Sequence, residues 1–464
     1  MPLAFHIENF GCRAARADGE AVASGLSRLG LASGSAPEAD VVVVNTCSVT
    51  AEADREARAY IRRAHRLNPK ARIVVTGCYA QRAPGELAGM PGVAAVIGNS
   101  HKALAPEIVS RLATEFPKPV LDGNLIPLHS LAGTAIYADD RFAHSFLEEV
   151  QIVPGSQTRP NLKIQEGCSN RCTFCVIPQT RGSSRSLAEE KVLAQVRGFV
   201  AAGGNELVLS GLNLGRWGRD LTESGSRPSL AQLVRRIFAG TDLPRLRLSS
   251  IEPMDWDRDL IALMREFGGG RLARHAHLPL QSGSDSVLRR MHRRYRPWHY
   301  EEKVHALREA AGPGLTLGAD VMTGFPGETD REFQETLDFI CRLPFGYLHL
   351  FPFSPRPGTR GWDLHRQFPV PAAVVHDRMA ALHWLAREKV RAHRASFVGQ
   401  RLECITLNSP EPLRLQNRTS LLSENFLPIE LEGALSPNLL VSARIVGLGS
   451  GEAILGLAEC DSRH

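Results

Sequence analysis

The sequence predicts an α/β protein with three folded parts: an N-terminal parallel-sheet domain, a central open barrel of six β/α units, and a small C-terminal β-barrel. At 464 residues the chain is too long for one ordinary hydrophobic core. Apolar runs of strand length alternate with helical stretches over most of it, and short alternating runs separated by turn residues end it. We place these parts at 1–119, 159–396 and 397–464, with a linker at 120–158.

The composition is typical of a globular protein, with 43% hydrophobic and 22% charged residues. No apolar run approaches the ~18 residues that a membrane helix needs, and the N-terminus lacks the basic and long apolar regions of a secretion signal. Nine cysteines, an odd number, favour a reducing compartment over a disulfide framework. We therefore expect a cytoplasmic protein.

In the N-terminal domain, buried parallel strands are expected at 3–7, 41–44, 73–75 and 93–97. Each of the first three is followed by a cysteine beside Gly, Asn or Thr, namely Cys12, Cys47 and Cys78. If these strands are neighbours, their carboxyl ends share one edge of the sheet and the three thiols converge there. The alternative is three buried structural cysteines. Convergent thiolates in a reducing compartment indicate an iron–sulfur cluster with one open iron.

A helix expected at 52–67 carries a row of arginines, Arg55, Arg58, Arg62, Arg63 and Arg66. Their spacing of three and four places several of them on one face. Such a face is either simply solvated or contacts nucleic-acid phosphates, and both interpretations stay open.

The central domain starts with a strand at 162–164 and a loop that carries Cys168, Cys172 and Cys175. Three thiolates on one loop can hold three irons of a [4Fe–4S] cluster and leave the fourth open to a substrate or cofactor. A structural zinc site would need a fourth Cys or His nearby, and none follows. Three adjacent cysteines also cannot all be used in disulfides.

Five further strand-like runs follow, at 206–209, 245–248, 275–280, 315–321 and 347–351. In a parallel barrel the functional residues gather where the strands end. The segments at those ends are rich in Gly and small polar residues: 210–213, 249–253, 280–284, 323–329 and 352–359.

Other conspicuous side chains in this domain have plain explanations. The arginines of 289–296 form either a solvated helix end or a phosphate-contacting patch. His275 and His277 are expected to be packed or hydrogen-bonded rather than ligands. Cys341, Cys404 and Cys460 are expected to be inert thiols.

The tail has four strand-like runs, at 402–407, 426–431, 439–448 and 453–457, which predict a small β-barrel. Such barrels commonly bind RNA through basic grooves. The net charge of the whole chain is +6, but residues 396–464 hold five Arg, no Lys and eight Asp or Glu. This acidity argues against the tail as the main grip on RNA, and a packing role is the alternative.

Taken together, these features resemble the radical S-adenosylmethionine (SAM) methylthiotransferases along nearly the whole chain. The matching residues are the N-terminal triad Cys12, Cys47 and Cys78, the loop triad Cys168, Cys172 and Cys175, and the SENF motif at Ser423–Phe426. The resemblance implies a C-terminal RNA-binding barrel of the kind called TRAM, SAM as cofactor and two [4Fe–4S] clusters. It assigns the loop triad to the cluster that cleaves SAM, and the N-terminal triad to an auxiliary cluster that supplies sulfur.

Several segments resemble the family branch that acts on threonylcarbamoyladenosine in tRNA: GCR at 11–13, PQTRGSSRS at 178–186, GLNLGRWGRDL at 211–221, RLSSIEP at 247–253 and PFSPRPGT at 352–359. This implies conversion of N6-threonylcarbamoyladenosine at position 37 of tRNA to its 2-methylthio derivative. The alternatives are isopentenyladenosine tRNA or a ribosomal protein aspartate as substrate, or a non-catalytic iron–sulfur protein that binds RNA or carries electrons. Ala15, Ala17, Asp18 and Gln179 depart from the pattern of the branch.

The resemblance also implies roles for individual residues. The SAM pocket would be lined by Phe174, Ser210, Gly211, Asn213, Ser250, Glu252, Gln281 and Gly324. Contacts to the substrate would come from Arg181, Arg185, Arg356 and Thr359. No catalytic residue beyond the cluster ligands is expected, and the partner would be the anticodon stem-loop of tRNA, bound by a monomer.

Overall fold

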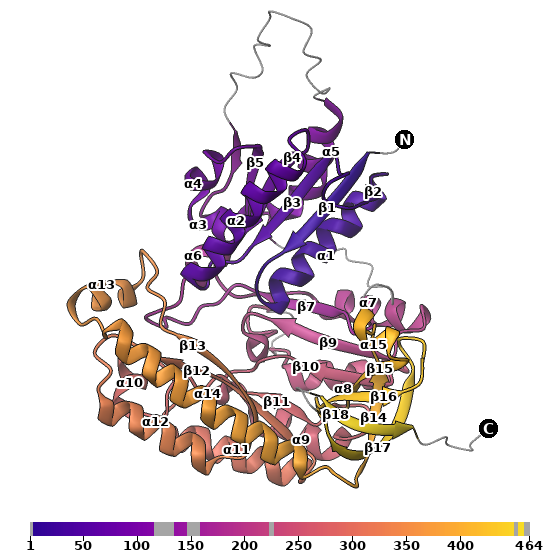
Figure 1. Cartoon of the computed structure of the whole chain (residues 1–464), viewed down its shortest axis with the longest axis vertical. Helices are drawn as coiled ribbons and strands as arrows, with labels where there is room; N and C mark the ends of the chain where they lie inside the picture. The colour runs from indigo at the N-terminus through magenta and orange to yellow at the C-terminus, as the bar shows by residue number, and fades with distance from the viewer. Residues whose placement is uncertain (1–2, 116–133, 146–157, 222–226, 450–452, 459–464) are drawn as a thin grey trace, which may run out of the picture. The chain divides into compact units, whose positions relative to one another are not determined.

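The computed structural model describes residues 3–115, 134–145, 158–221, 227–449 and 453–458 (Figure 1). The chain forms two compact units. The first unit consists of Met1–Gln151, Glu166–Arg185 and Ser354–Thr359, and the second of Ile152–Gln165, Ser186–Phe353 and Arg360–His464. Most of the predicted linker at 120–158, together with Cys460, lies outside the described residues.

The first unit is built on a parallel sheet with the strand order β2-β1-β3-β4-β5-β6. Its strands are β1 (Ala4–Asn9), β2 (Ala32–Ser33), β3 (Val41–Thr46), β4 (Arg72–Gly77), β5 (Val93–Gly98) and β6 (Ala135–Tyr137). The four predicted strands are confirmed as β1, β3, β4 and β5. The two short edge strands were missed, because two or three residues carry no readable period, and β6 falls inside the predicted linker.

Helices cover both faces of this sheet, which explains why β3 is a continuous valine run. They are α1 (Arg13–Arg28), α2 (Ala51–Leu67), α3 (Cys78–Arg82), α4 (Pro84–Ala88), the 3-10 helix η1 (Asn99–Leu104) and α5 (Ala105–Glu115). Val42 and Val44 pack with α2, whereas Val41 and Val43 pack with α1 and α5. A parallel strand buried on both faces is apolar at every position, as the sequence analysis assumed.

The second unit contains the parallel strands of the central domain in the order β7-β9-β10 and β11-β12-β13. Their bounds are β7 (Asn161–Glu166), β9 (Glu206–Gly211), β10 (Arg245–Leu248), β11 (His275–His277), β12 (Thr316–Thr323) and β13 (Phe345–Pro352), and the two-residue β8 (Arg185–Ser186) pairs with β7. An isolated parallel bridge pairs Leu246 of β10 with Leu272, which lies three residues before β11. Within the described chain β13 does not pair with β7, so the barrel is open as predicted.

The helices between these strands are α6 (Ile177–Arg181), α7 (Glu189–Ala201), α8 (Leu230–Gly240), α9 (Arg258–Phe267), α10 (Asp285–Arg290), α11 (Pro297–Ala311) and α12 (Asp330–Arg342), followed by α13 (Arg360–Gln367) and α14 (Ala372–Ala395). Two short 3-10 turns, η3 (Leu214–Arg216) and η4 (Pro253–Asp255), follow β9 and β10. Strand β11 ends earlier than predicted because Pro279 has no N–H to donate to a neighbouring strand. None of the helices in the described ranges is long and apolar enough to cross a membrane.

The tail forms a closed barrel in the order β14-β15-β16-β18-β17. Its elements are β14 (Arg401–Thr406), α15 (Glu411–Leu415), β15 (Arg418–Ser423), β16 (Pro428–Glu432), β17 (Leu440–Leu448) and β18 (Ile454–Ala458). The prediction missed β15, whose first three residues are polar.

The SENF motif packs the tail barrel against the starts of the central strands. Glu424 accepts hydrogen bonds from Arg274, and Asn425 Nδ2 donates to the carbonyl of Gly314 at 3.0 Å. Ser423, Glu424 and Asn425 are buried. This arrangement supports the packing role for the motif.

Candidate active site

The N-terminal cysteines follow three adjacent strands. Cys12 follows β1 at the N-cap of α1, Cys47 follows β3, and Cys78 begins α3 directly after β4. Gly11 has a φ of 105°, and a Cβ built on it would lie 2.8 Å from Cys47 Sγ. The chain can therefore pass this close to Cys47 only with glycine at position 11.

The thiols of this triad are close enough to influence one another. Burial, followed by the charges of Cys78 and Cys12, raises the pKa of the Cys47 thiol to about 12. A bound cation would favour the Cys47 thiolate, because the thiolate and not the thiol is the metal ligand. The positive N-terminal end of α1 at Cys12 favours negative charge in the same place. The donor set fits an iron–sulfur cluster.

A buried charge network lies beside Cys78. Arg181 is 1% exposed, and its Nε donates to Cys78 Sγ at 3.2 Å. Its Nη1 donates to Asp18 at 2.8 Å and to Glu166 at 3.0 Å. Lys102 Nζ contacts the same two carboxylates, at 2.9 and 2.7 Å. Although burial by itself lowers the pKa of Arg181, Cys78 and the two carboxylates hold it well above its usual value.

A second donor to Cys78 comes from η1. Asn99 Nδ2 lies 3.4 Å from Cys78 Sγ and also donates to the carbonyl of Thr180 at 2.9 Å. Sequence reasoning missed Asn99 and Lys102. A usable signal was present for Asn99, which follows β5 directly, just as a cysteine follows each of β1, β3 and β4.

The loop triad lies in the same unit as the N-terminal triad. The loop closes on itself, since Cys168 N donates to Gly182 O at 3.0 Å and Cys175 N to Cys172 O at 3.2 Å. All three cysteines and Phe174 are half-buried, so the thiols can be reached from one side. Three thiols on one loop fit a cluster with one open iron.

Helix α6 connects the two triads within the first unit. It begins two residues after Cys175 and ends at Arg181, which contacts Cys78. The thiols from three sheet strands and the thiols from one loop are thereby fixed in a single compact unit.

The residues predicted to contact substrate are mostly engaged by protein groups. Arg356 is 3% exposed and donates to Asp54 at 2.6 Å, and Thr359 Oγ1 donates to the carbonyl of Arg356 at 2.7 Å. Arg181 is held in its buried network. Arg185 is half-buried and donates to the carbonyl of Phe142 at 2.6 Å. The geometry therefore favours a structural role for Arg181, Arg356 and Thr359.

Two of the departures from the branch pattern also have partners in the first unit. Asp18 accepts from Arg181 and Lys102, and Gln179 Nε2 donates to the carbonyl of Gly358 at 2.6 Å. Ala15 is buried, and its carbonyl accepts from Asn45 Nδ2 at 2.6 Å.

In the second unit, the strand ends carry buried polar atoms without protein partners. These atoms are Ser210 Oγ near the end of β9, Ser249 Oγ after β10 and Gln281 Oε1 after β11, with no hydrogen-bond partner among the described residues. Gln281 also has a φ of 65°, which is uncommon for a residue other than glycine. Because an unpaired buried polar group costs about 1–3 kcal/mol, such atoms indicate a ligand with polar groups.

The other predicted SAM residues lie near the same strand ends. Gly211 leaves room for Gln165, whose Oε1 accepts from Asn213 N at 2.7 Å. Gly324 has a φ of 76° and donates its N–H to Glu328 at 2.7 Å. Ser250 is half-buried.

The arginines of the segment 289–296 are held in ion pairs. Each of its five arginines pairs with a carboxylate: Arg289 and Arg296 with Asp285, Arg290 with Glu332, Arg293 with Glu252, and Arg294 with Asp255. The phosphate-patch interpretation is therefore not supported. Arg293 holds the predicted SAM residue Glu252 at 2.6 Å.

The histidines on β11 are buried, and both contact the hydroxyl of Tyr347, at 2.8 Å for His275 and 2.9 Å for His277. The prediction that they are hydrogen-bonded is confirmed. Burial raises the pKa of the Cys404 thiol to about 12, which fits an inert thiol.

Comparison with known protein families matches two parts of the chain. Residues 4–98 match the family described as "Uncharacterized protein family UPF0004", and residues 162–340 match the radical SAM superfamily.

The chain is similar to curated enzymes over most of its length. It is 34% identical to the threonylcarbamoyladenosine tRNA methylthiotransferase MtaB of Aquifex aeolicus, over 96% of this chain and 100% of that protein. It is 34% identical to MtaB of Bacillus subtilis, over 85% and 82% of the two chains. It is also 31% identical to the tRNA-2-methylthio-N(6)-dimethylallyladenosine synthase of Bartonella quintana, over 86% and 85%.

Among solved structures, the radical SAM methyltransferase TsrM of Kitasatospora setae matches with a TM-score of 0.54 at 17% identity, over 79% of this chain and 78% of that one. This likeness concerns the fold alone. The near-full-length sequence matches show that the chain belongs to the radical SAM methylthiotransferase family, to which these tRNA-modifying enzymes also belong.

Proposed function

We propose that this enzyme transfers a methylthio group to carbon 2 of N6-threonylcarbamoyladenosine at position 37 of tRNA. The likeness to the MtaB proteins supports this substrate. The observation that carries the chemistry is the placement of both cysteine triads in one compact unit, with α6 joining the loop triad to Cys78 through Arg181.

Membership of the radical SAM superfamily implies a [4Fe–4S] cluster and SAM. We assign that cluster to Cys168, Cys172 and Cys175, and a second cluster to Cys12, Cys47 and Cys78. When bound, the clusters and SAM supply the radical that breaks an inert C–H bond, together with the sulfur and the methyl group.

The chain itself binds, orients and shields these groups. Arg181 and Asn99 donate N–H groups to the Cys78 sulfur, so they would stabilise its thiolate and fix its direction. In the second unit, Ser210, Ser249 and Gln281 offer their unpaired polar atoms, which we assign to polar groups of SAM.

Contact with tRNA phosphates is assigned to α2 of the first unit. Arg62, Arg63 and Arg66 are exposed on this helix, whereas Arg58 donates to the hydroxyl of Tyr79. Exposed arginines on one helix suit the sequence-independent contact that phosphates make. The tail barrel is net acidic and buries Ser423, Glu424 and Asn425 of its SENF motif, so we give it a packing role.

Mass spectrometry of tRNA nucleosides from a deletion strain tests the substrate. The expected result is loss of 2-methylthio-threonylcarbamoyladenosine, accumulation of its precursor, and recovery of the product when the gene is restored. Loss of the methylthio derivative of isopentenyladenosine instead would move the protein to the branch of the Bartonella quintana relative. Unchanged tRNA with an unmodified ribosomal aspartate would reject a tRNA substrate.

A further inference from the structure

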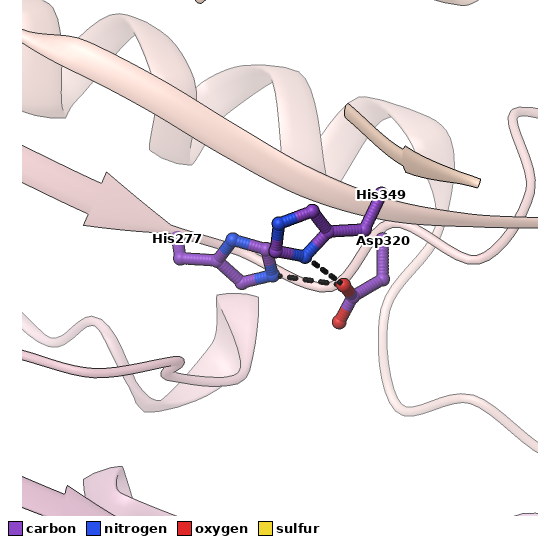
Figure 2. Close-up of side chains that lie close together, drawn as sticks. All are labelled: His277, Asp320 and His349. Carbon is purple, nitrogen blue, oxygen red and sulfur yellow. Dashed lines mark hydrogen bonds and ion pairs between the residues drawn. The ribbon is translucent and has the colours of Figure 1, made fainter. Parts of the chain in front are cut away.

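Three side chains from neighbouring strands of the second unit meet at one point. His277 lies on β11, Asp320 on β12 and His349 on β13 (Figure 2). Asp320 and His349 are register partners of the parallel pair β12–β13, and Figure 2 shows all three side chains pointing toward one another. We propose that these residues bind a divalent first-row transition-metal ion, of the Zn²⁺ or Fe²⁺ class.

The spacing of the ligand atoms suits such an ion. Asp320 Oδ1 lies 3.1 Å from His277 Nε2 and 3.2 Å from His349 Nδ1. An ion with bonds of about 2.1 Å to nitrogen and oxygen holds adjacent ligand atoms roughly 3.0 Å apart at right angles and roughly 3.4 Å apart in a tetrahedron. All three ligand atoms lie within 4.8 Å of one another, so binding requires only small side-chain movements.

The surroundings of His277 resemble those of a histidine ligand. Its second ring nitrogen, Nδ1, lies 2.9 Å from the hydroxyl of Tyr347, which leaves Nε2 directed at Asp320. Such an outer contact fixes the orientation of a ligating imidazole. Tyr347 occupies this position because residue 318 is glycine, where a Cβ would lie 2.0 Å from the tyrosine ring.

Asp320 is available as an anionic ligand. Its Oδ1 faces a ring nitrogen of both histidines. This carboxylate and the two imidazoles form a two-histidine, one-carboxylate set. That set is typical of transition-metal sites which keep open positions.

The site can be reached from outside. The His349 side chain is 63% exposed, and His349 and Tyr347 line a cavity of about 900 Å³. Arg387 and Arg391 of α14 line the same cavity, so an anionic oxygen donor would be attracted to an open position on the ion. His277, which was expected from the sequence to be packed or hydrogen-bonded rather than a ligand, becomes a ligand in this proposal.

The test uses the full chain with both triads intact, reconstituted anaerobically, treated with a chelator that spares the clusters, and titrated with Co²⁺ and separately with Zn²⁺. The wild type should bind one Zn²⁺ per chain more than His349→Ala or Asp320→Asn, with an unchanged iron content. Co²⁺ should give d–d absorption bands without a thiolate charge-transfer band, and these should vanish in both variants. His305→Ala, an exposed histidine on α11, should behave like the wild type.

Tyr347→Phe keeps all three ligands and loses the outer contact, so it should weaken Zn²⁺ binding by about 10–100-fold. His349 is exposed, so His349→Ala keeps the test valid if Asp320→Asn folds poorly. Equal Zn²⁺ contents in the wild type and His349→Ala, with no Co²⁺ bands, would show that the three side chains are only a hydrogen-bonded cluster.

Discussion

The buried charges around Arg181 and the buried neutral polar atoms at the ends of β9, β10 and β11 differ in how they are paired. Around Arg181, in the first unit, two cations pair with two carboxylates at 2.7–3.0 Å. At the strand ends of the second unit, Ser210, Ser249 and Gln281 each keep a buried polar atom without a partner in the described chain.

This difference distinguishes a network that stabilises the fold from a region that binds a ligand. Paired buried charges are costly to break, so they hold the cysteines of the first unit in one arrangement. Unpaired polar atoms are costly to keep, so they indicate a ligand that pairs with them. Substitutions in the first region should therefore damage structure and cluster binding, whereas those in the second should weaken ligand binding alone.

The largest effect is expected from the first unit. Cys47→Ala removes one ligand of the auxiliary cluster, so methylthiolated product should fall below detection while SAM cleavage to 5′-deoxyadenosine persists. Cys172→Ala is the matched variant in the loop triad and should abolish both. Liquid chromatography with mass spectrometry measures both products, and equal loss of SAM cleavage in the two variants would contradict the assignment.

The next largest effect is expected from Arg181→Ala. It leaves Asp18 and Glu166 buried with only Lys102 as a countercharge, which should lower the free energy of unfolding by about 3–5 kcal/mol. Urea unfolding followed by circular dichroism measures this loss. The control is Arg185→Ala, a half-buried arginine four residues on. Similar unfolding midpoints for both variants would show that the charge network around Arg181 does not stabilise the first unit.

Ser249→Ala tests whether the strand ends of the second unit bind a ligand. Because Ser249 Oγ has no hydrogen-bond partner in the part of the chain that the structure describes, its loss should leave the unfolding midpoint unchanged while it weakens SAM binding. Loss of one hydrogen bond worth about 0.5–1.5 kcal/mol corresponds to a Kd increase of about 2–13-fold, which calorimetry under nitrogen can measure. A lower unfolding midpoint with an unchanged Kd for SAM would show that Ser249 stabilises the fold instead.

The smallest effect is expected from reversing the charge of arginines on α2, which should weaken tRNA binding. The double variant Arg62→Glu, Arg66→Glu should weaken tRNA binding and reduce the slope of log affinity against log salt by about 2. The charge-matched double variant Arg235→Glu, Arg265→Glu, on α8 and α9 of the second unit, should bind as the wild type does. Filter binding at several salt concentrations measures both, and equal losses would remove α2 as the phosphate contact.

The sequence predicted the features that depend on residues close together in the chain. The buried valine run of β3 and the cysteine after each strand were readable because parallel strands bury both faces and end at one edge. The charge network was not readable: Arg181 lies 163 residues from Asp18, and Lys102 lies 84 from it. The arginines of 289–296 likewise looked free until tertiary packing supplied their carboxylates.

The cluster of His277, Asp320 and His349 shows the same limit. His277 stands out in the sequence, but the pairing of Asp320 with His349 depends on the register between β12 and β13. No spacing within a single strand encodes that register.

The central claim, that two separate triads hold two separate clusters, is tested most directly by counting iron. Anaerobically reconstituted wild type should bind about eight irons per chain, and Cys47→Ala and Cys172→Ala about four each. Mössbauer spectra of each variant should show the one remaining [4Fe–4S] cluster. About four irons in the wild type, with a loss in both variants, would mean that the six cysteines share one cluster and would contradict the account.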